Sequence, residues 1–125
     1  MPTDRVMLTV PARGEFARTV RMTASEVVSR RGASYDDVDD VRMAADEAFV
    51  LACARLQPDS SLTFTFDIDE GTLVCVVGPM PCGDGGALED EGGRYAEFIL
   101  ESVCDEFGCV VEGDVSYLRL VKRIG

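Results

Sequence analysis

The side chains of this chain that could do chemistry are its carboxylates and its five cysteines, because its 125 residues include no histidine. Without histidine, a Ser-His-Asp triad, a Cys-His pair and a histidine-ligated zinc site are all excluded. Four of the cysteines lie in apolar surroundings, where cysteine usually serves as a small buried side chain. The fifth lies in a loop-like segment, and no two cysteines form the C-x-x-C pair of redox and zinc motifs. The four are Cys53, Cys75, Cys104 and Cys109, and the loop cysteine is Cys82.

The excess of acidic over basic residues limits the kinds of partner that the protein could bind. Asp and Glu number 23 against 12 Lys and Arg, which gives a formal net charge of −11. Nucleic acids and anionic membrane surfaces are bound through cationic residues, so the sequence argues against both, whereas an acidic domain suits a basic protein surface. The N-terminal residues lack the layout of a signal peptide, and no apolar run reaches the length of a transmembrane helix. We therefore expect a cytoplasmic protein.

The elements that would position these side chains fit into a single domain over residues 1–125, which is long enough to bury a core without disulfides or metals. Alternating apolar residues predict strands over residues 6–10, 62–68, 73–77, 109–112 and 115–121. Apolar residues at three- and four-residue spacing predict helices over residues 15–31, 34–58 and 94–107. Helices placed between antiparallel strands indicate an α+β fold, a two-layer sandwich with the helices on one face of the sheet.

Residues 78–93 (GPMPCGDGGALEDEGG) form a biased segment that is rich in glycine, proline and acids. Its acids could bind a basic partner, or the segment could be a flexible, solvated loop. Pro79 and Pro81 could form a rigid turn that contacts a partner, or they could simply end the preceding strand. Tyr95, Phe98 and Ile99 in the next predicted helix could form a recognition surface, although apolar residues at this spacing usually belong to the core.

Four segments carry a resemblance to a known family: RMAADEAFVLA (42–52), LVCVV (73–77), YAEFILESVCDEF (95–107) and YLRLVKRI (117–124). In this order, with a glycine-rich loop before the third segment, they resemble the bacterial anti-sigma factor serine kinases. These kinases belong to the GHKL ATPase superfamily, shared with histidine kinases and DNA gyrase. The likeness spans nearly the whole chain. It implies the histidine-kinase-like ATPase fold, a mainly antiparallel sheet covered on one face by three helices, and it implies a homodimer.

The nucleotide site of that family can be carried over only in part. In the family's helix motif E-x-x-x-N, the Glu is the general base and the Asn binds magnesium. Glu47 matches the Glu, but Leu51 stands at the Asn position and offers no oxygen to a hard cation. The family's D-x-G-x-G, whose Asp binds the adenine amino group, has no acid at the matching strand end, and Asp84 comes a few residues later. Arg94-Tyr95-Ala96 stands near the family's phosphate-binding G-x-G, where side chains hinder the close backbone approach that glycine permits.

The resemblance therefore leaves Glu47 as a vestigial catalytic candidate and leaves a vestigial ATP loop, with no metal site and no cofactor. The loop candidates are Asp84, Gly85, Gly92 and Gly93. The loop's acids would repel a triphosphate wherever water is partly excluded; they are Asp84, Glu89, Asp90 and Glu91. We expect Leu51 to pack inward, toward the space that nucleotide occupies in active relatives.

Three functions are compatible with this resemblance, because function depends on sites rather than on folds. The leading interpretation is an anti-sigma-factor-like regulatory protein that acts by protein–protein binding in a partner-switching pathway. Its partners would be a sigma factor, a STAS-type anti-sigma factor antagonist, or both. The alternative is an ATP-dependent serine/threonine kinase that phosphorylates such an antagonist and holds magnesium with Asp84 and Glu47. A third interpretation is an accessory subunit that stabilises an active homologue as a heterodimer.

Overall fold

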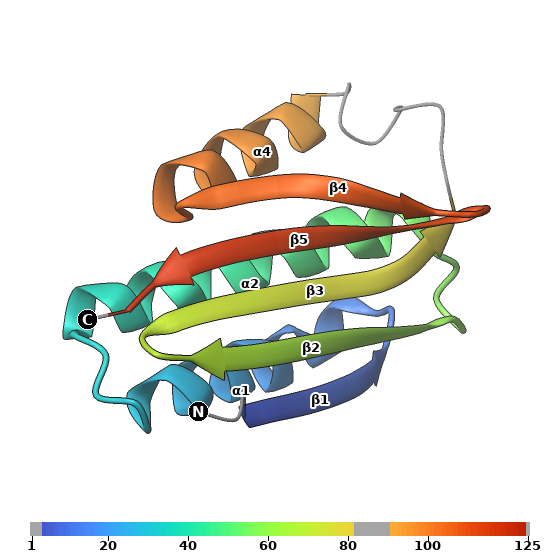
Figure 1. Ribbon diagram of the computed structural model, residues 1–125. Coiled ribbons are helices and arrows are strands. Elements are labelled where there is room, and N and C mark those ends of the chain that lie inside the picture. The colour runs from blue at the N-terminus through green and yellow to red at the C-terminus, as the bar shows by residue number, and fades with distance from the viewer. Residues whose placement is uncertain (1–3, 82–90, 125) are drawn as a thin grey trace.

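Strands and helices follow one another in the order that the sequence predicts. The structure, a computed structural model, describes residues 4–81 and 91–124. In these ranges the chain forms β1 (Asp4–Pro11), a 3-10 turn (Gly14–Phe16), α1 (Ala17–Ser29), α2 (Tyr35–Arg55), β2 (Ser61–Asp69), β3 (Thr72–Pro81), α4 (Glu91–Val103), β4 (Glu106–Glu112) and β5 (Val115–Arg123) (Figure 1). None of the helices described is long and apolar enough to cross a bilayer.

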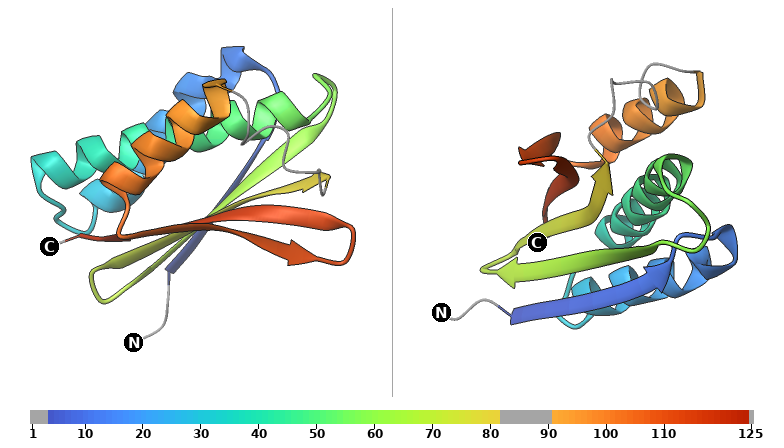
Figure 2. Two further views of the ribbon diagram at one scale, coloured as in Figure 1. Left: turned by 90° about the horizontal axis from the view of Figure 1, so that it is seen from above. Right: turned by 90° about the vertical axis from the view of Figure 1, so that its right-hand side faces the viewer.

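The strands form one five-stranded sheet in the order β1-β2-β3-β5-β4, and every neighbouring pair is antiparallel. All three described helices lie on one face of this sheet, with α2 between α1 and α4 (Figure 2). The opposite face carries no helix in the described ranges, and β1 and β4 are the two edges of the sheet. This arrangement confirms the predicted α+β two-layer sandwich.

The start of α2 follows from the sequence around Ser34. The Ser34 hydroxyl accepts a hydrogen bond from the backbone N–H of Asp37 at 3.1 Å, which satisfies one of the free donors of the first turn. Asp36 and Asp37 add negative charge where the helix dipole favours it. Lys122 of β5 donates a hydrogen bond to Asp40 at 3.0 Å and so ties the first half of α2 to the sheet.

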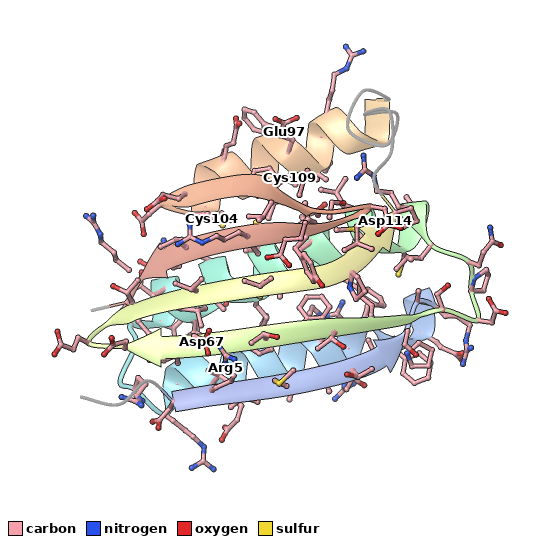
Figure 3. The ribbon with its side chains drawn as sticks, turned by 45° about the vertical axis from the view of Figure 1, so that its right-hand side comes forward. Arg5, Asp67, Glu97, Cys104, Cys109 and Asp114 are labelled. Atoms are coloured by element: carbon pink, nitrogen blue, oxygen red, sulfur yellow. The ribbon has the colours of Figure 1, made fainter. Side chains whose placement is uncertain are left out.

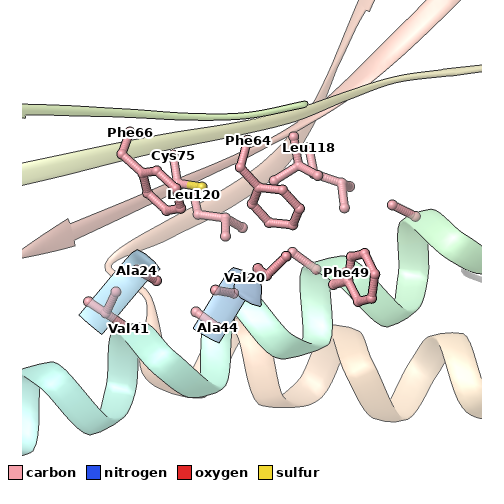
Figure 4. Packing of buried hydrophobic residues seen from close by; sticks show 14 of the residues in the cluster. Val20, Ala24, Val41, Ala44, Phe49, Phe64, Phe66, Cys75, Leu118 and Leu120 are labelled. Atoms are coloured by element: carbon pink, nitrogen blue, oxygen red, sulfur yellow. The ribbon is translucent and has the colours of Figure 1, made fainter. Parts of the chain in front are cut away.

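The core lies between the sheet and the helices (Figure 4). The inward-facing residues of β2 are all buried, and the residues between them face the other side; the buried ones are Leu62, Phe64, Phe66 and Ile68. Phe64 packs against Phe49 of α2 with ring centroids 6.2 Å apart. The helices contribute small side chains at the contact, above all the alanines of α2.

The helix-free face of the sheet is polar at its β1–β2 end. Arg5 and Asp67 lie side by side there (Figure 3), and the guanidinium donates two hydrogen bonds to the carboxylate at 2.6 and 2.9 Å. Thr9 and Thr63 are joined by a hydroxyl hydrogen bond of 2.8 Å. Alternation along β2 therefore places apolar residues inward and polar residues outward, as the period of a half-buried strand predicts, whereas β1 also exposes Met7 on the outer face.

The end of β3 differs from the prediction. The sequence suggested a loop from Gly78 onward, but β3 continues to Pro81, and Met80 is buried. Pairing with β2 stops at Gly78, and the register with β5 shifts between Val77 and Met80. At this end of β3 the register is shifted and β2 is no longer a neighbour, so not every backbone N–H is needed for pairing. Prolines, which have no backbone N–H, are therefore tolerated in the last residues of the strand.

The α4–β4 boundary also differs. The predicted helix over residues 94–107 in fact begins at Glu91 and ends at Val103, so Gly92 and Gly93 lie in its first turn rather than in the loop. Strand β4 begins at Glu106 instead of Cys109. Phe107 continues the helical spacing in the sequence, but it pairs with Leu120 across the β4–β5 hairpin, so strand pairing overrides the local pattern.

Gly78 of β3 lies close against Ser116 and Tyr117 of β5, and this contact generates a stability prediction. A Cβ added at Gly78 would lie 2.5 Å from Cδ1 of Tyr117 and 3.0 Å from the backbone oxygen of Ser116. We expect Gly78→Ala to lower the free energy of unfolding by about 1–3 kcal/mol because side chain and backbone must both shift. Urea unfolding followed by circular dichroism measures this loss.

The matched control is Gly108→Ala on β4, where an added Cβ meets nothing within 4 Å. This variant should change the free energy of unfolding by no more than about 0.5 kcal/mol. An equal loss in both variants would show that the close contact at Gly78 is not the cause.

Candidate functional site

Glu47 lies on α2, the central helix of the layer, and is half-buried. Burial raises the pKa of its carboxyl above the ordinary value, and the neighbouring charge of Asp46 raises the pKa further. Both effects disfavour the charged carboxylate. The pKa of a general base works best near the operating pH, and the shift at Glu47 is in that direction.

Asp46, next in sequence, faces another direction because successive helix residues are rotated by about 100°. Its carboxylate accepts a hydrogen bond from Arg21 of α1 at 2.9 Å, and the pair links α1 to α2. The carboxylate is therefore half-buried in an ion pair rather than free in solvent. Asp46 has a structural partner, whereas Glu47 lies on a different side of α2.

Leu51 follows Glu47 by one helical turn and is part of the hydrophobic core, with 4% of its surface exposed. The burial of Leu51 is confirmed, whereas its placement toward the space that nucleotide occupies in active relatives stays a prediction. It lies on the same helix as buried Ala48 and Ala52, and its hydrocarbon side chain has no atom that could ligate magnesium. The pair formed by Glu47 and Leu51 therefore offers at most one oxygen ligand group.

The other candidate residues lie near the beginning of α4 or outside the described residues. Gly92 and Gly93 lie in the first turn of α4, which packs beside α2 (Figure 1). Asp84 and Gly85 lie outside the described residues, so their placement beside Glu47 stays a prediction. Within the described ranges, no three acidic or cysteine side chains are grouped so that they could hold a metal ion.

Two aromatic residues on α4 are exposed, a feature that the sequence left open. Tyr95 and Phe98, here called the aromatic patch, have 64% and 68% of their surface exposed. The buried face of α4 is built instead from Ala96 and Leu100, and Ile99 is half-buried. Large exposed apolar side chains next to each other on one helix face are typical of interaction sites. Tyr95 and Phe98 are therefore not core residues, and their role as a recognition surface stays a prediction.

The four described cysteines are free thiols. Cysteines in apolar surroundings are usually buried, but of these four only Cys75 is buried, Cys53 and Cys104 are half-buried, and Cys109 is exposed on edge strand β4. Burial raises the pKa of the Cys104 thiol to about 11, and burial likewise raises the pKa of the Cys75 thiol. Because the thiolate is the reactive form, these two thiols are unsuited to nucleophilic chemistry.

Comparison with known proteins relates this architecture to one family. The profile of the histidine kinase-like ATPase domain matches residues 10–95. Serine-protein kinase RsbW from Staphylococcus epidermidis is 28% identical over an alignment of 142 positions that covers 96% of this chain and 89% of that protein. The protein of the same name from Staphylococcus aureus has the same identity and coverage.

A solved structure has the same fold. The crystal structure of the RsbU and RsbW domains of a Mycobacterium tuberculosis protein superimposes with a TM-score of 0.75 and 20% sequence identity. The match covers 98% of this chain and 33% of that chain. The present chain thus spans about a third of the length of that protein, and the likeness concerns the fold.

The raised pKa of Glu47 predicts how stability depends on pH. A carboxyl whose pKa is raised on folding stabilises the folded state below its unfolded pKa, and this contribution is lost as the pH rises through the folded pKa. Glu47→Gln removes the ionisable carboxyl and, with it, this loss of folded-state stability at higher pH. We expect the variant to exceed the wild type in free energy of unfolding at about pH 7, by less than about 1 kcal/mol because water screens the site.

The difference should shrink as the pH is lowered and Glu47 becomes protonated in both the folded and the unfolded state. Urea unfolding at several pH values measures it, and Glu101→Gln at an exposed position of α4 serves as the control. A Glu47→Gln difference that does not change with pH would contradict the electrostatic cause.

Proposed function

Because the chain belongs to the histidine kinase-like ATPase family, within its anti-sigma factor serine kinases, we propose that it is a regulatory protein that acts by binding other proteins in a partner-switching pathway. Its partners in this proposal are a sigma factor, a STAS-domain anti-sigma factor antagonist, or both, and it works as a homodimer. The nucleotide site is degenerate and does not bind ATP.

The burial of Leu51 is the observation that carries the proposal. In the family's helix motif this position supplies an amide oxygen to magnesium, whereas here a leucine lies in the core. Magnesium demands oxygen ligands in near-octahedral geometry, and one carboxylate from Glu47 leaves that geometry incomplete. Strand β3 adds support, since Gly78, Pro79 and Met80 occupy the strand end where the family has its adenine-binding acid.

The aromatic patch supports the binding role. Tyr95 and Phe98 project from a helix that also carries Glu97 and Glu101, in a chain with a net charge of −11. Aromatic residues are enriched among those that contribute most binding energy in interfaces, and acidic surroundings accelerate encounter with a basic partner. A protein surface with both apolar and basic residues would fit this helix face.

Titration calorimetry with ATP, with and without magnesium, tests the loss of the nucleotide site. We expect no magnesium-dependent heat at millimolar ATP, because the site lacks an oxygen ligand at Leu51. An intact kinase of the same family, titrated under the same conditions, shows that the assay detects binding. Micromolar, magnesium-dependent binding would overturn this part of the proposal.

The kinase alternative rests on one specific observation, the half-buried Glu47 with its raised pKa. The similar Staphylococcus proteins are named serine-protein kinases, which is also compatible with it. In this case ATP and a STAS-domain antagonist should yield a phosphorylated antagonist, and Glu47→Gln should abolish the transfer while leaving the fold intact. Absence of phosphate transfer in the wild type would exclude the alternative.

The double variant Tyr95→Ser/Phe98→Ser tests the aromatic patch. Both side chains are exposed, so the fold should be unchanged, while affinity for the sigma factor or antagonist of the same organism should fall by about tenfold or more. Biolayer interferometry measures the affinity. Met7→Ser/Tyr35→Ser removes an exposed pair elsewhere and should leave binding unchanged. Equal effects of the two double variants would argue against a specific role for the patch.

A further inference from the structure

Strand β4 is an edge of the sheet that lacks the usual protection against pairing. Among the described residues it pairs with β5 alone, so its other side presents backbone donors and acceptors to solvent. Natural edge strands are commonly protected by a proline, a lysine or a charge in the middle of the strand. The central residues of β4, Phe-Gly-Cys-Val-Val over positions 107–111, contain none of these.

The side chains of this edge are also accessible. Val111 has 65% of its surface exposed, and Val110 and Cys109 are exposed as well. Cys109 pairs with Leu118 and lies on the helix-covered side, beneath Glu97 of α4 (Figure 3). Val110 pairs with Tyr117 and lies on the opposite side. A strand added at this edge would therefore find apolar side chains on both faces of the sheet.

Acidic residues surround the uncharged centre. Glu106 and Glu112 are the two ends of β4, and Asp105 and Asp114 lie just beyond them. Arg119 forms a long ion pair of 3.6 Å with Glu106, the first residue of β4. Glu112 is the last residue of β4 and lies at the other end of the strand. The charge pattern along the edge is thus negative at both ends and neutral in the middle.

The other edge of the sheet is different. Strand β1 ends in Pro11, which has no backbone donor, and its first residues are engaged in ion pairs. Asp4 pairs with Arg31 of α1, and Arg5 pairs with Asp67 of β2. These charges and the proline are the protection that β4 lacks, so β1 provides a comparison within the same molecule.

We propose that the free edge of β4 binds an extended segment of a partner protein by strand addition, and that this segment carries basic residues flanking a β-branched, apolar centre. Backbone hydrogen bonds would supply affinity, and the glutamates at the two ends would select the basic residues. A second copy of this chain is a poor occupant, because antiparallel self-pairing centred on Cys109 would place Glu106 opposite Glu112. This proposal does not depend on the absence of ATP binding.

Two synthetic peptides test the proposal: KVTVTVK, whose length matches the seven residues of β4, and its charge-reversed counterpart EVTVTVE. Titration of the full-length ¹⁵N-labelled protein with KVTVTVK should shift the backbone amide signals of residues 106–112 in the heteronuclear NMR spectrum. EVTVTVE should bind about tenfold more weakly or not at all.

Val111→Lys places a cation on the edge and should weaken binding of KVTVTVK by about tenfold. Met7→Lys on β1, where 63% of the residue's surface is exposed, is the matched control and should bind within about twofold of the wild type. Glu112→Lys is a second variant on β4; it should weaken binding of KVTVTVK and strengthen binding of EVTVTVE. This reversal of preference cannot result from a general loss of fold.

Four outcomes would overturn the proposal. The first is no binding of KVTVTVK by the wild type, and the second is signal shifts concentrated away from β4. The third is equal binding of the two peptides by the wild type. The fourth is a wild-type dimer that becomes monomeric in Val111→Lys by analytical ultracentrifugation, because a second copy would then occupy the edge.

Discussion

The close approach of α2 to the sheet determines the rest of the architecture. It depends on four buried alanines, Ala44, Ala45, Ala48 and Ala52, whose small side chains let the helix backbone come near the sheet, above all near β3. Helices α1 and α4 pack on either side of α2. Glu47 and Leu51 are part of this helix, so the packing that forms the core also fixes their directions. Full burial of a leucine contributes about 1.5–3 kcal/mol, which makes position 51 a stabilising contact at the place where the family has a metal ligand.

Much of this fold can be predicted from the sequence because its patterns are strong where one face is buried. The alternation in β2 and the helical spacing in α2 each reflect a single apolar face, and Ser34 marks the beginning of α2. The ends of elements are harder to predict, because they depend on partners that are distant in sequence. Phe107 fits a helix locally but pairs with Leu120, and Met80 follows a proline yet is buried beside β5.

The candidate site could be predicted only in part, and the reasons are physical. The identity of Glu47 and the loss of the amide at Leu51 are visible in the sequence, but the burial that raises the pKa of Glu47 is a property of the packed helix layer. The exposure of Tyr95 and Phe98 could not be deduced, since helical spacing alone does not say which apolar residues face the sheet. Helix α4 uses Ala96 and Leu100 for that purpose and leaves the larger rings outside.

The sheet alternates between local and distant strand pairings, which determines the sequence of events in folding. The hairpins β2–β3 and β4–β5 close through tight turns in which Gly71 and Gly113 adopt positive φ. By contrast, Arg5 of β1 and Asp67 of β2 are 62 residues apart, and β3 meets β5 only across the whole of α4. The entropic cost of closing such loops must be met before their contacts stabilise the chain. We therefore expect each hairpin to form early, and we expect docking of the two hairpins and addition of β1 to be the slower steps.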